Sequence, residues 1–392
     1  MPAAPAMIAP PSRWDVFCKV VDNFGDAGVA WRLARLLAAE HGIEVTLWLD
    51  RPEALARIDP GIAAGAAVQR ARGVTVRRWT DLLPAEATAD VVVEAFGCGL
   101  PEGYLRSMAA RSAPPRWFVL EYLSAELWVD GAHGLASPHP RLPLPRRFWF
   151  PGFSAGSGGL LRERGLIAAR DAFRHDGPAA ASLWASLGVP GPAAGETRVS
   201  LFCYPDAPLP ALLDAWAAGD DDVVGVIPEG VATSALERWC GRGAPRAGAA
   251  PLVRGRLRLH VVPFVAQDDY DRLLWACDIN FVRGEDSFVR AQWAARPFVW
   301  QPYAQDGGAH LTKLDAFVDR YAAGLAPAAA GALSRFWQAW NRHPDAGPVG
   351  AGWPEFARAR PDLADHGPAW AAHLAALPEL AAGLVKAARI GV

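Results

Sequence analysis

Short runs of apolar residues alternate along the chain with segments in which apolar residues recur at helical spacing. Residues 14–21 and 43–49 are runs typical of buried strands, and residues 29–40 between them have the pattern of an amphipathic helix. Gly42 follows that helix closely, as expected at a helix end. Further strands are expected at 74–79, 90–96 and 117–123. The chain therefore opens as a βαβ unit and continues into a parallel sheet.

A second series of the same kind begins after a cluster of Pro and Gly at 188–195. The pattern predicts strands at 199–204, 223–227, 257–262 and 297–300, and helices at 210–217, 270–276 and 309–322. We predict an α/β protein with two Rossmann-like domains that face each other across a cleft, as in GT-B glycosyltransferases and some epimerases. The expected divisions are a flexible tail at 1–13, an N-terminal domain at 14–190, a C-terminal domain at 191–367, and a helical segment at 368–392 that can pack back on the N-terminal domain.

Composition and charge exclude several classes of protein. The 392 residues are enough for two domains, and with 52% hydrophobic and 20% charged residues the chain can bury a large core. The formal net charge of -2 gives no basic field for nucleic acid. No apolar run of about 18 residues predicts a membrane span. The five cysteines are widely spaced without a CxxC pair, which fits a reducing compartment, and the N-terminus lacks a signal-peptide pattern, so we expect a cytoplasmic protein.

The first strand leads into a turn with two carboxylates, Val21-Asp22-Asn23-Phe24-Gly25-Asp26-Ala27-Gly28. Its glycines do not match GxGxxG, so the dinucleotide-binding fingerprint is absent. Asp22 is expected directly at the carboxyl end of the first strand, where α/β sheets hold their ligands. Asp26 is well placed to cap the helix that follows. Asp22 as a simple turn former is the structural alternative.

A second turn, Arg283 to Ser287, joins an apolar strand to a helix at 287–295. Ser287 can cap this helix, whose first N–H groups favour an anion. Arg283 offers a guanidinium fork suited to phosphate oxygens, and Gly284 lets the backbone approach a ligand. In the alternative interpretation, Glu285 and Asp286 only complement the helix dipole.

With both turns considered together, the chain resembles one family, EarP, the protein-arginine rhamnosyltransferases that modify bacterial elongation factor P. The two turns are specific in combination, whereas either alone is weak. The other matching stretches are 14–18, 31–35, 121–126, 151–153, 158–163, 283–293 and 297–300, with Tyr303, Gln305, Asp306 and His310. The N-terminal extension and Gln301 depart from the family pattern, and neither touches the two turns.

The resemblance implies a GT-B fold, TDP-β-L-rhamnose as the sugar donor, inversion at the anomeric carbon, and an arginine of elongation factor P as the acceptor. It implies catalytic roles for Asp22, Asp26 and Glu285, with Asp22 as the base-like residue. The residues implied for substrate binding are Asn23, Phe24, Gly25, Tyr204, Phe264, Gln267, Arg283, Gly284, Asp286, Ser287, Tyr303 and Asp306.

Among these, Phe264 is the expected stacking surface for thymine, and Tyr204, Arg283 and Ser287 are expected along the diphosphate. No cofactor and no metal are expected, and the acidic runs at 220–222 and 268–269 are interpreted as solvated loops. Neither a nucleic acid nor a membrane is expected as a partner.

The chemistry suits these residue types. An arginine side chain has a pKa above roughly 12, so a lone carboxylate cannot deprotonate it in the ground state. We expect Asp22 to orient the guanidinium and to accept its proton as the C–N bond forms, and Asp26 to grip its other face. Two alternatives stay open: a GT-B-type transferase that uses another acceptor, and a non-catalytic protein that binds a nucleotide sugar.

Overall fold

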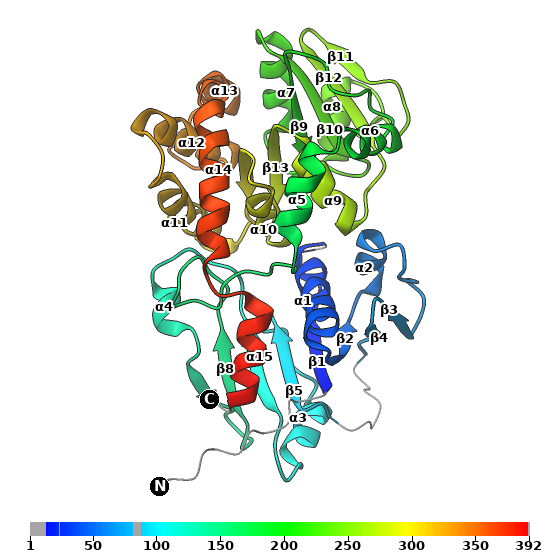
Figure 1. Cartoon of the computed structure of the whole chain (residues 1–392), viewed down its shortest axis with the longest axis vertical. Helices are drawn as coiled ribbons and strands as arrows, with labels where there is room; N and C mark the ends of the chain where they lie inside the picture. The colour runs from blue at the N-terminus through cyan, green and yellow to red at the C-terminus, as the bar shows by residue number, and fades with distance from the viewer. Residues whose placement is uncertain (1–12, 23, 81–87, 391–392) are drawn as a thin grey trace. The chain divides into compact units, whose positions relative to one another are not determined.

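The computed structural model describes residues 13–22, 24–80 and 88–390. The chain divides into two compact units (Figure 1). The N-terminal unit comprises Met1–Arg164 together with Ala375–Val392, and the C-terminal unit comprises Gly165–Leu374. The predicted tail, except Arg13, lies outside the described residues. Each unit has its own α/β sheet, which confirms the predicted class of two Rossmann-like domains.

The N-terminal unit is built on a sheet with the strand order β3-β4-β2-β1-β5-β6-β8-β7. Its strands are β1 (Arg13–Cys18), β2 (Glu44–Leu49), β3 (Val68–Ala71), β4 (Val74–Arg78), β5 (Val91–Ala95), β6 (Arg116–Leu120), β7 (Ala136–Pro138) and β8 (Pro145–Trp149). Its helices are α1 (Gly25–His41), α2 (Pro52–Ile58), α3 (Glu102–Ala109), α4 (Trp128–Ala132) and α15 (Leu380–Ile390). The edge strands β3 and β7 pair antiparallel, and the central strands pair parallel.

The C-terminal unit has the strand order β11-β12-β10-β9-β13-β14. The strands are β9 (Glu196–Leu201), β10 (Asp222–Pro228), β11 (Leu252–Arg254), β12 (Leu257–Val262), β13 (Ile279–Arg283) and β14 (Phe298–Gln301). The helices are α5 (Leu166–His175), α6 (Gly177–Ser186), α7 (Leu209–Ala218), α8 (Thr233–Cys240), α9 (Gln267–Ala276), α10 (Asp286–Ala294), the short 3-10 helix η1 (Asp306–Gly308), α11 (Ala309–Ala322), α12 (Pro327–Trp340), α13 (Val349–Arg358) and α14 (Arg360–Ala375).

Both sheets reverse their strand order beside the first strand of the unit. In the N-terminal unit β1 lies between β2 and β5, and in the C-terminal unit β9 lies between β10 and β13. Open α/β sheets bind ligands beyond the carboxyl ends of the strands at such a switch point. The turns after β1 and β13, which the sequence singled out, therefore both occupy this position.

Aromatic packing holds the carboxyl ends of these strands in place. Phe17 near the end of β1 stacks on Trp48 with ring centroids 5.6 Å apart, and Tyr104 packs edge-on at 4.8 Å. In the C-terminal unit Phe288 of α10 stacks on Trp300 of β14 at 3.9 Å. These buried rings fix the strand ends and the start of α10, so the turns between them rest on rigid supports.

The units change over earlier in the chain than the boundary expected near 188–195. Helices α5 and α6 pack on α9 within the C-terminal unit, where Arg170 Nη1 donates to the carbonyl of Trp293 at 2.9 Å. The Pro- and Gly-rich stretch connects α6 to β9 inside that unit, and Gly188 and Gly195 supply its left-handed turns with φ of 68° and 82°. The Pro and Gly residues at 188–195 therefore belong to a tight connection within the C-terminal unit, and the two units meet in the chain between Arg164 and Gly165.

The last helix, α15, packs on α1 and belongs to the N-terminal unit. Leu160 pairs with Glu379 in an isolated bridge just before it. None of the helices in the described part of the chain has the length and apolar character needed to cross a membrane.

Candidate functional site

The turn after β1 is organised by Asp26. Its Oδ2 accepts the backbone N–H groups of Val21 and Asp22, each at 2.8 Å. The sequence led us to expect Asp26 to cap α1, and this prediction is wrong. Asp26 is the second residue of the helix, and its carboxylate turns back to the loop. The residue at the cap position is Phe24, which makes no side-chain capping bond.

The strand is also shorter than predicted, since β1 ends at Cys18 and three residues separate its end from Asp22. The intervening loop is fixed by side chains, because Val20 N–H donates to Asp50 Oδ1 at 2.9 Å. The result is an Asp22 side chain that is 8% exposed beside the start of α1. Asn23, also predicted to bind substrate, lies outside the described residues.

Gly25 leaves room for the Asp22 carboxylate. Gly25 N–H donates to the Asp22 carbonyl at 2.6 Å, which brings the two residues together. A Cβ at position 25 would overlap Asp22 Oδ2 and lie 3.1 Å from Asp22 Cγ. A side chain here would therefore displace the carboxylate, so the glycine serves the geometry of Asp22.

Burial and charge act together on Asp26, which is 3% exposed. Burial raises its pKa to about 6, the two backbone N–H bonds lower the pKa, and the negative charge of Asp22 raises it. Because the negative charges of Asp22 and Asp26 act on each other, the two carboxylates form an acidic site that a bound cation would stabilise. This property fits the expected guanidinium acceptor.

A buried ion pair on α1, between Arg32 and Glu163, was not predicted from the sequence. Arg32 of α1 is 1% exposed and forms a two-pronged ion pair with Glu163, with Nε–Oε1 at 2.7 Å and Nη2–Oε2 at 2.6 Å. It ties α1 to the segment that follows Leu160. Both residues fall within stretches that carry the family resemblance, but their pairing across 131 positions has no local sequence signal.

In the C-terminal unit, the turn after β13 is closed by Ser287. Its Oγ accepts the N–H of Arg283 at 3.0 Å and donates to the carbonyl of Arg283 at 2.6 Å. The predicted capping role is therefore wrong: Ser287 is the second residue of α10, and Glu285 occupies the cap position. Gly284 has a φ of 60°, a left-handed conformation that this tight turn requires.

The Arg283 guanidinium is held between two aromatic rings. Its Cζ lies 4.5 Å from the ring centroids of both Phe202 and Tyr204, and Nη1 donates to the carbonyl of Cys203 at 3.2 Å. Such stacking stabilises and orients the guanidinium plane. Phe202 was not among the predicted site residues, although it is one of the two rings that orient Arg283.

The remaining predicted donor-side residues gather around the same strand ends. Tyr303, which follows β14, packs edge-on against Tyr204 at 5.6 Å. Phe264, between β12 and α9, lies 6.2 Å from Phe202. Gln267 Nε2 donates to Asp286 Oδ2 at 2.8 Å. Asp306 belongs to η1, and its side chain lies outside the described part of the structure.

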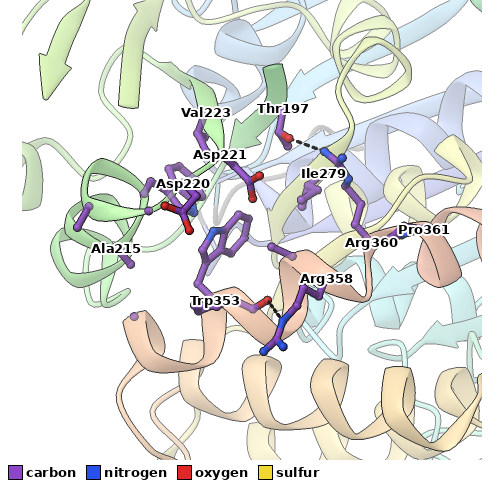
Figure 2. Close-up of a pocket in the computed structure, with 16 residues that line it drawn as sticks. Thr197, Ala215, Asp220, Asp221, Val223, Ile279, Trp353, Arg358, Arg360 and Pro361 are labelled. Carbon is purple, nitrogen blue, oxygen red and sulfur yellow. Dashed lines mark hydrogen bonds between the residues drawn. The ribbon is translucent and has the colours of Figure 1, made fainter. Parts of the chain in front are cut away.

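A pocket of about 720 Å³ opens elsewhere in the C-terminal unit (Figure 2). It is lined by Thr197, Val223 and Ile279, which lie at the amino ends of β9, β10 and β13. The Arg283–Ser287 turn lies at the carboxyl ends of the same sheet, so this pocket is not the predicted sugar-nucleotide site. Asp220 and Asp221 line it and are exposed, as expected of a solvated loop. The other acidic residues interpreted as loops are not in loops: Asp222 begins β10, and Asp268 and Asp269 lie in the first turn of α9.

Within residues 13–22, 24–80 and 88–390, no group of three or more His, Cys, Asp or Glu side chains could hold a metal ion.

Comparison with known proteins identifies the family. The family model described as "Elongation-Factor P (EF-P) rhamnosyltransferase EarP" matches residues 14–389. A protein-arginine rhamnosyltransferase of Pseudomonas putida is 48% identical over 374 residues, which cover 95% of this chain and 98% of that protein. Its counterpart in Pseudomonas aeruginosa is 47% identical and covers 96% and 98% of the two chains.

A solved structure, described as the structural basis for EarP-mediated arginine glycosylation of translation elongation factor EF-P, is also similar. It matches with a TM-score of 0.69 and 36% identity, covering 97% of this chain and 99% of that chain. The fold and the matches together define a glycosyltransferase of the two-domain α/β GT-B class. Within that class, the chain belongs to the EarP family of elongation factor P rhamnosyltransferases.

Proposed function

We propose that this enzyme transfers L-rhamnose from TDP-β-L-rhamnose to the side chain of one arginine in translation elongation factor P, with inversion at the anomeric carbon. The observation that carries the proposal is the pair of buried carboxylates, Asp22 and Asp26, in a chain whose relatives are named protein-arginine rhamnosyltransferases. A cationic acceptor fits such a pair, whereas a neutral sugar hydroxyl does not need it. Because the acceptor is a translation factor, the proposed location is the cytoplasm.

On the acceptor side, Asp22 orients the guanidinium of the incoming arginine and localises its charge. A nitrogen lone pair attacks the anomeric carbon while the bond from that carbon to the diphosphate oxygen breaks. TDP leaves with the bonding electron pair. The attacking nitrogen becomes acidic as the C–N bond forms, so its proton can pass to Asp22. Asp26 supports this step by holding the amide of Asp22 and by adding negative charge.

On the donor side, negative charge develops on the departing diphosphate. Arg283, held between two rings, offers a pre-oriented cation, and the N-terminus of α10 adds N–H groups. We assign thymine to the face of Phe264 and the second essential carboxylate to Glu285. Arg283 and the N–H groups of α10 stabilise the negative charge of the leaving diphosphate without a metal ion, so no metal is included in the proposal.

The decisive experiment incubates the purified enzyme with TDP-β-L-rhamnose and elongation factor P and then measures the intact mass of the factor. The expected result is a gain of one deoxyhexose on an arginine, which persists in EDTA and is absent when that arginine is replaced by lysine. The anomeric configuration of the product, determined by NMR, tests inversion.

Other results would identify the alternatives. Donor consumption with a different acceptor, and none with elongation factor P, would indicate a transferase of other specificity. Binding of TDP-rhamnose without turnover on any acceptor would indicate a nucleotide-sugar-binding protein.

A further inference from the structure

A network of side-chain hydrogen bonds joins α9 to α10 and includes two of the predicted donor residues, Gln267 and Asp286. Arg290 Nε donates to Asp286 Oδ2 at 2.9 Å, and Arg290 Nη1 donates to Asp271 Oδ2 at 2.7 Å. Gln267 Nε2 donates to the same Asp286 oxygen at 2.8 Å. Gln267 and Asp271 are one helical turn apart on α9, and Asp286 and Arg290 are one turn apart on α10. The four side chains therefore form one continuous hydrogen-bonded chain.

Arg290 is the centre of this network. It is 1% exposed, and both of its ion pairs are with buried or nearly buried carboxylates. A buried guanidinium can be held only by such partners, because the loss of water is costly for a charge. The orientation of Arg290 is therefore fixed by Asp271 on one side and by Asp286 on the other.

Asp286 raises an electrostatic problem that Arg290 solves. It is the first residue of α10, at the helix end that favours an anion, next to the Arg283 turn assigned to the diphosphate. An uncompensated carboxylate there would repel a diphosphate. Arg290 supplies the opposite charge at hydrogen-bond distance, and together with Gln267 it holds one carboxylate oxygen in a defined direction.

We propose that Arg290 is a positioning residue for the binding of the nucleoside diphosphate sugar, that it acts through Asp286 and Gln267, and that Asp271 holds it in place. This inference rests on the proposed function, since it requires the TDP-sugar donor assigned there, and the family resemblance implies that Asp286 and Gln267 bind that donor. Arg290 fixes the direction of the Asp286 carboxylate, which accepts a hydrogen bond from Gln267, and it neutralises the charge of that carboxylate. Arg290 does not itself touch the reacting atoms.

A conservative variant and a matched control separate positioning from stability. R290K keeps the positive charge but loses the fork that reaches both carboxylates. R198K is the control, because Arg198 is 3% exposed in the same unit and is also held by a buried ion pair, with Glu196 at 2.6 Å. Arg198 lies on β9 near its amino end, away from the Arg283 turn. We expect both variants to lower the melting temperature.

The sugar-nucleotide readouts should differ between the two. R290K should raise the KM for TDP-rhamnose and the Kd for TDP, measured by calorimetry, about tenfold each, with kcat within about twofold of wild type. R198K should leave both constants unchanged. In a D286N background, R290K should no longer change the Kd for TDP, because Arg290 acts through that carboxylate.

The inference is overturned if R290K destabilises the protein as R198K does but leaves the TDP Kd at the wild-type value. It is also overturned if the effect of R290K on Kd persists in full beside D286N. Wild-type enzyme is measured first with TDP-rhamnose and elongation factor P. Failure of wild type to bind TDP or to modify the factor would overturn the proposed function, which is a different result from wild-type activity with an unaffected R290K.

Discussion

The backbone N–H of Asp22 donates to Asp26 Oδ2 at 2.8 Å, so the second carboxylate of the turn holds the first in place. This hydrogen bond indicates different roles for the two carboxylates. Asp26 is 3% exposed and engaged with the loop, whereas Asp22 is the more accessible of the two at 8%. We therefore assign the proton-accepting step to Asp22 and a supporting role to Asp26.

The first prediction concerns D22N. Asparagine keeps the size of the side chain but has no negative charge with which to orient a guanidinium or accept its proton. Turnover should fall by at least about a hundredfold, the lower end for loss of a general base. The Kd for TDP should not change, because the assigned nucleotide contacts lie elsewhere in the chain. Mass spectrometry of elongation factor P and calorimetry with TDP measure the two effects. Near-normal turnover by D22N would remove this assignment.

The second prediction concerns G25A. The new methyl group overlaps Asp22 Oδ2, so the carboxylate must rotate away. Because Gly25 is in α1 and has no left-handed backbone, the helix tolerates alanine, and the folded state should survive. We expect kcat to fall toward the level of D22N while circular dichroism and TDP binding stay at wild-type values.

The matched control for G25A is G131A on α4, where a Cβ meets no heavy atom within 4 Å. That variant should retain full activity. Equal activity of G25A and G131A would contradict the view that Gly25 makes room for the catalytic carboxylate.

The third prediction is a pH dependence of stability. Burial raises the pKa of Asp26 from 3.8 to about 6 in the folded protein. Between these values the unfolded chain has lost the proton while the folded protein retains it. Stability contributed by protonated Asp26 is therefore complete below pH 3.8 and is lost as the pH rises to about 6. The loss is on the order of 3 kcal/mol, at about 1.4 kcal/mol per unit of pKa.

D26N isolates this effect, since asparagine still offers an oxygen to the two backbone N–H groups and does not titrate. Urea unfolding at several pH values should show the stability of D26N rising relative to wild type as the pH increases from about 4 to 6, and constant relative stability above that. A constant difference across the whole range would mean that Asp26 has an ordinary pKa. In the wild-type enzyme, activity should also fall below about pH 6, as Asp26 loses its charge.

The fourth prediction concerns Arg283. In R283K the planar group that lies between Phe202 and Tyr204 is replaced by a single ammonium on a flexible stem. The KM for TDP-rhamnose should rise about tenfold or more, as expected when an oriented charge-assisted contact to phosphate is lost. R256K is the control, because Arg256 is an exposed residue paired with Asp222 at 3.3 Å. Equal KM values for the two variants would show that Arg283 does not contact the diphosphate.

The sequence by itself determined the class of fold and the location of the two turns. Parallel strands buried on both faces are nearly continuous apolar runs, and the residues after them must emerge at one edge of the sheet. The polar stretches at Asp22–Asp26 and Arg283–Ser287 could therefore be selected from the pattern. The family resemblance, carried by the same residues, supplied the expected reaction.

Only the tertiary structure decided which partner each side chain chose. Asp26 and Ser287 were both expected to cap helices, and both bond to loop or strand backbone instead, since each is the second residue of its helix and not the residue before it. Arg283 is oriented by Phe202, about eighty positions away, and Arg290 by Asp271 on the preceding helix. Such contacts depend on which strands and helices become neighbours. Local periodicity predicts which way each side chain points from its own backbone, but it does not predict which residue that side chain contacts.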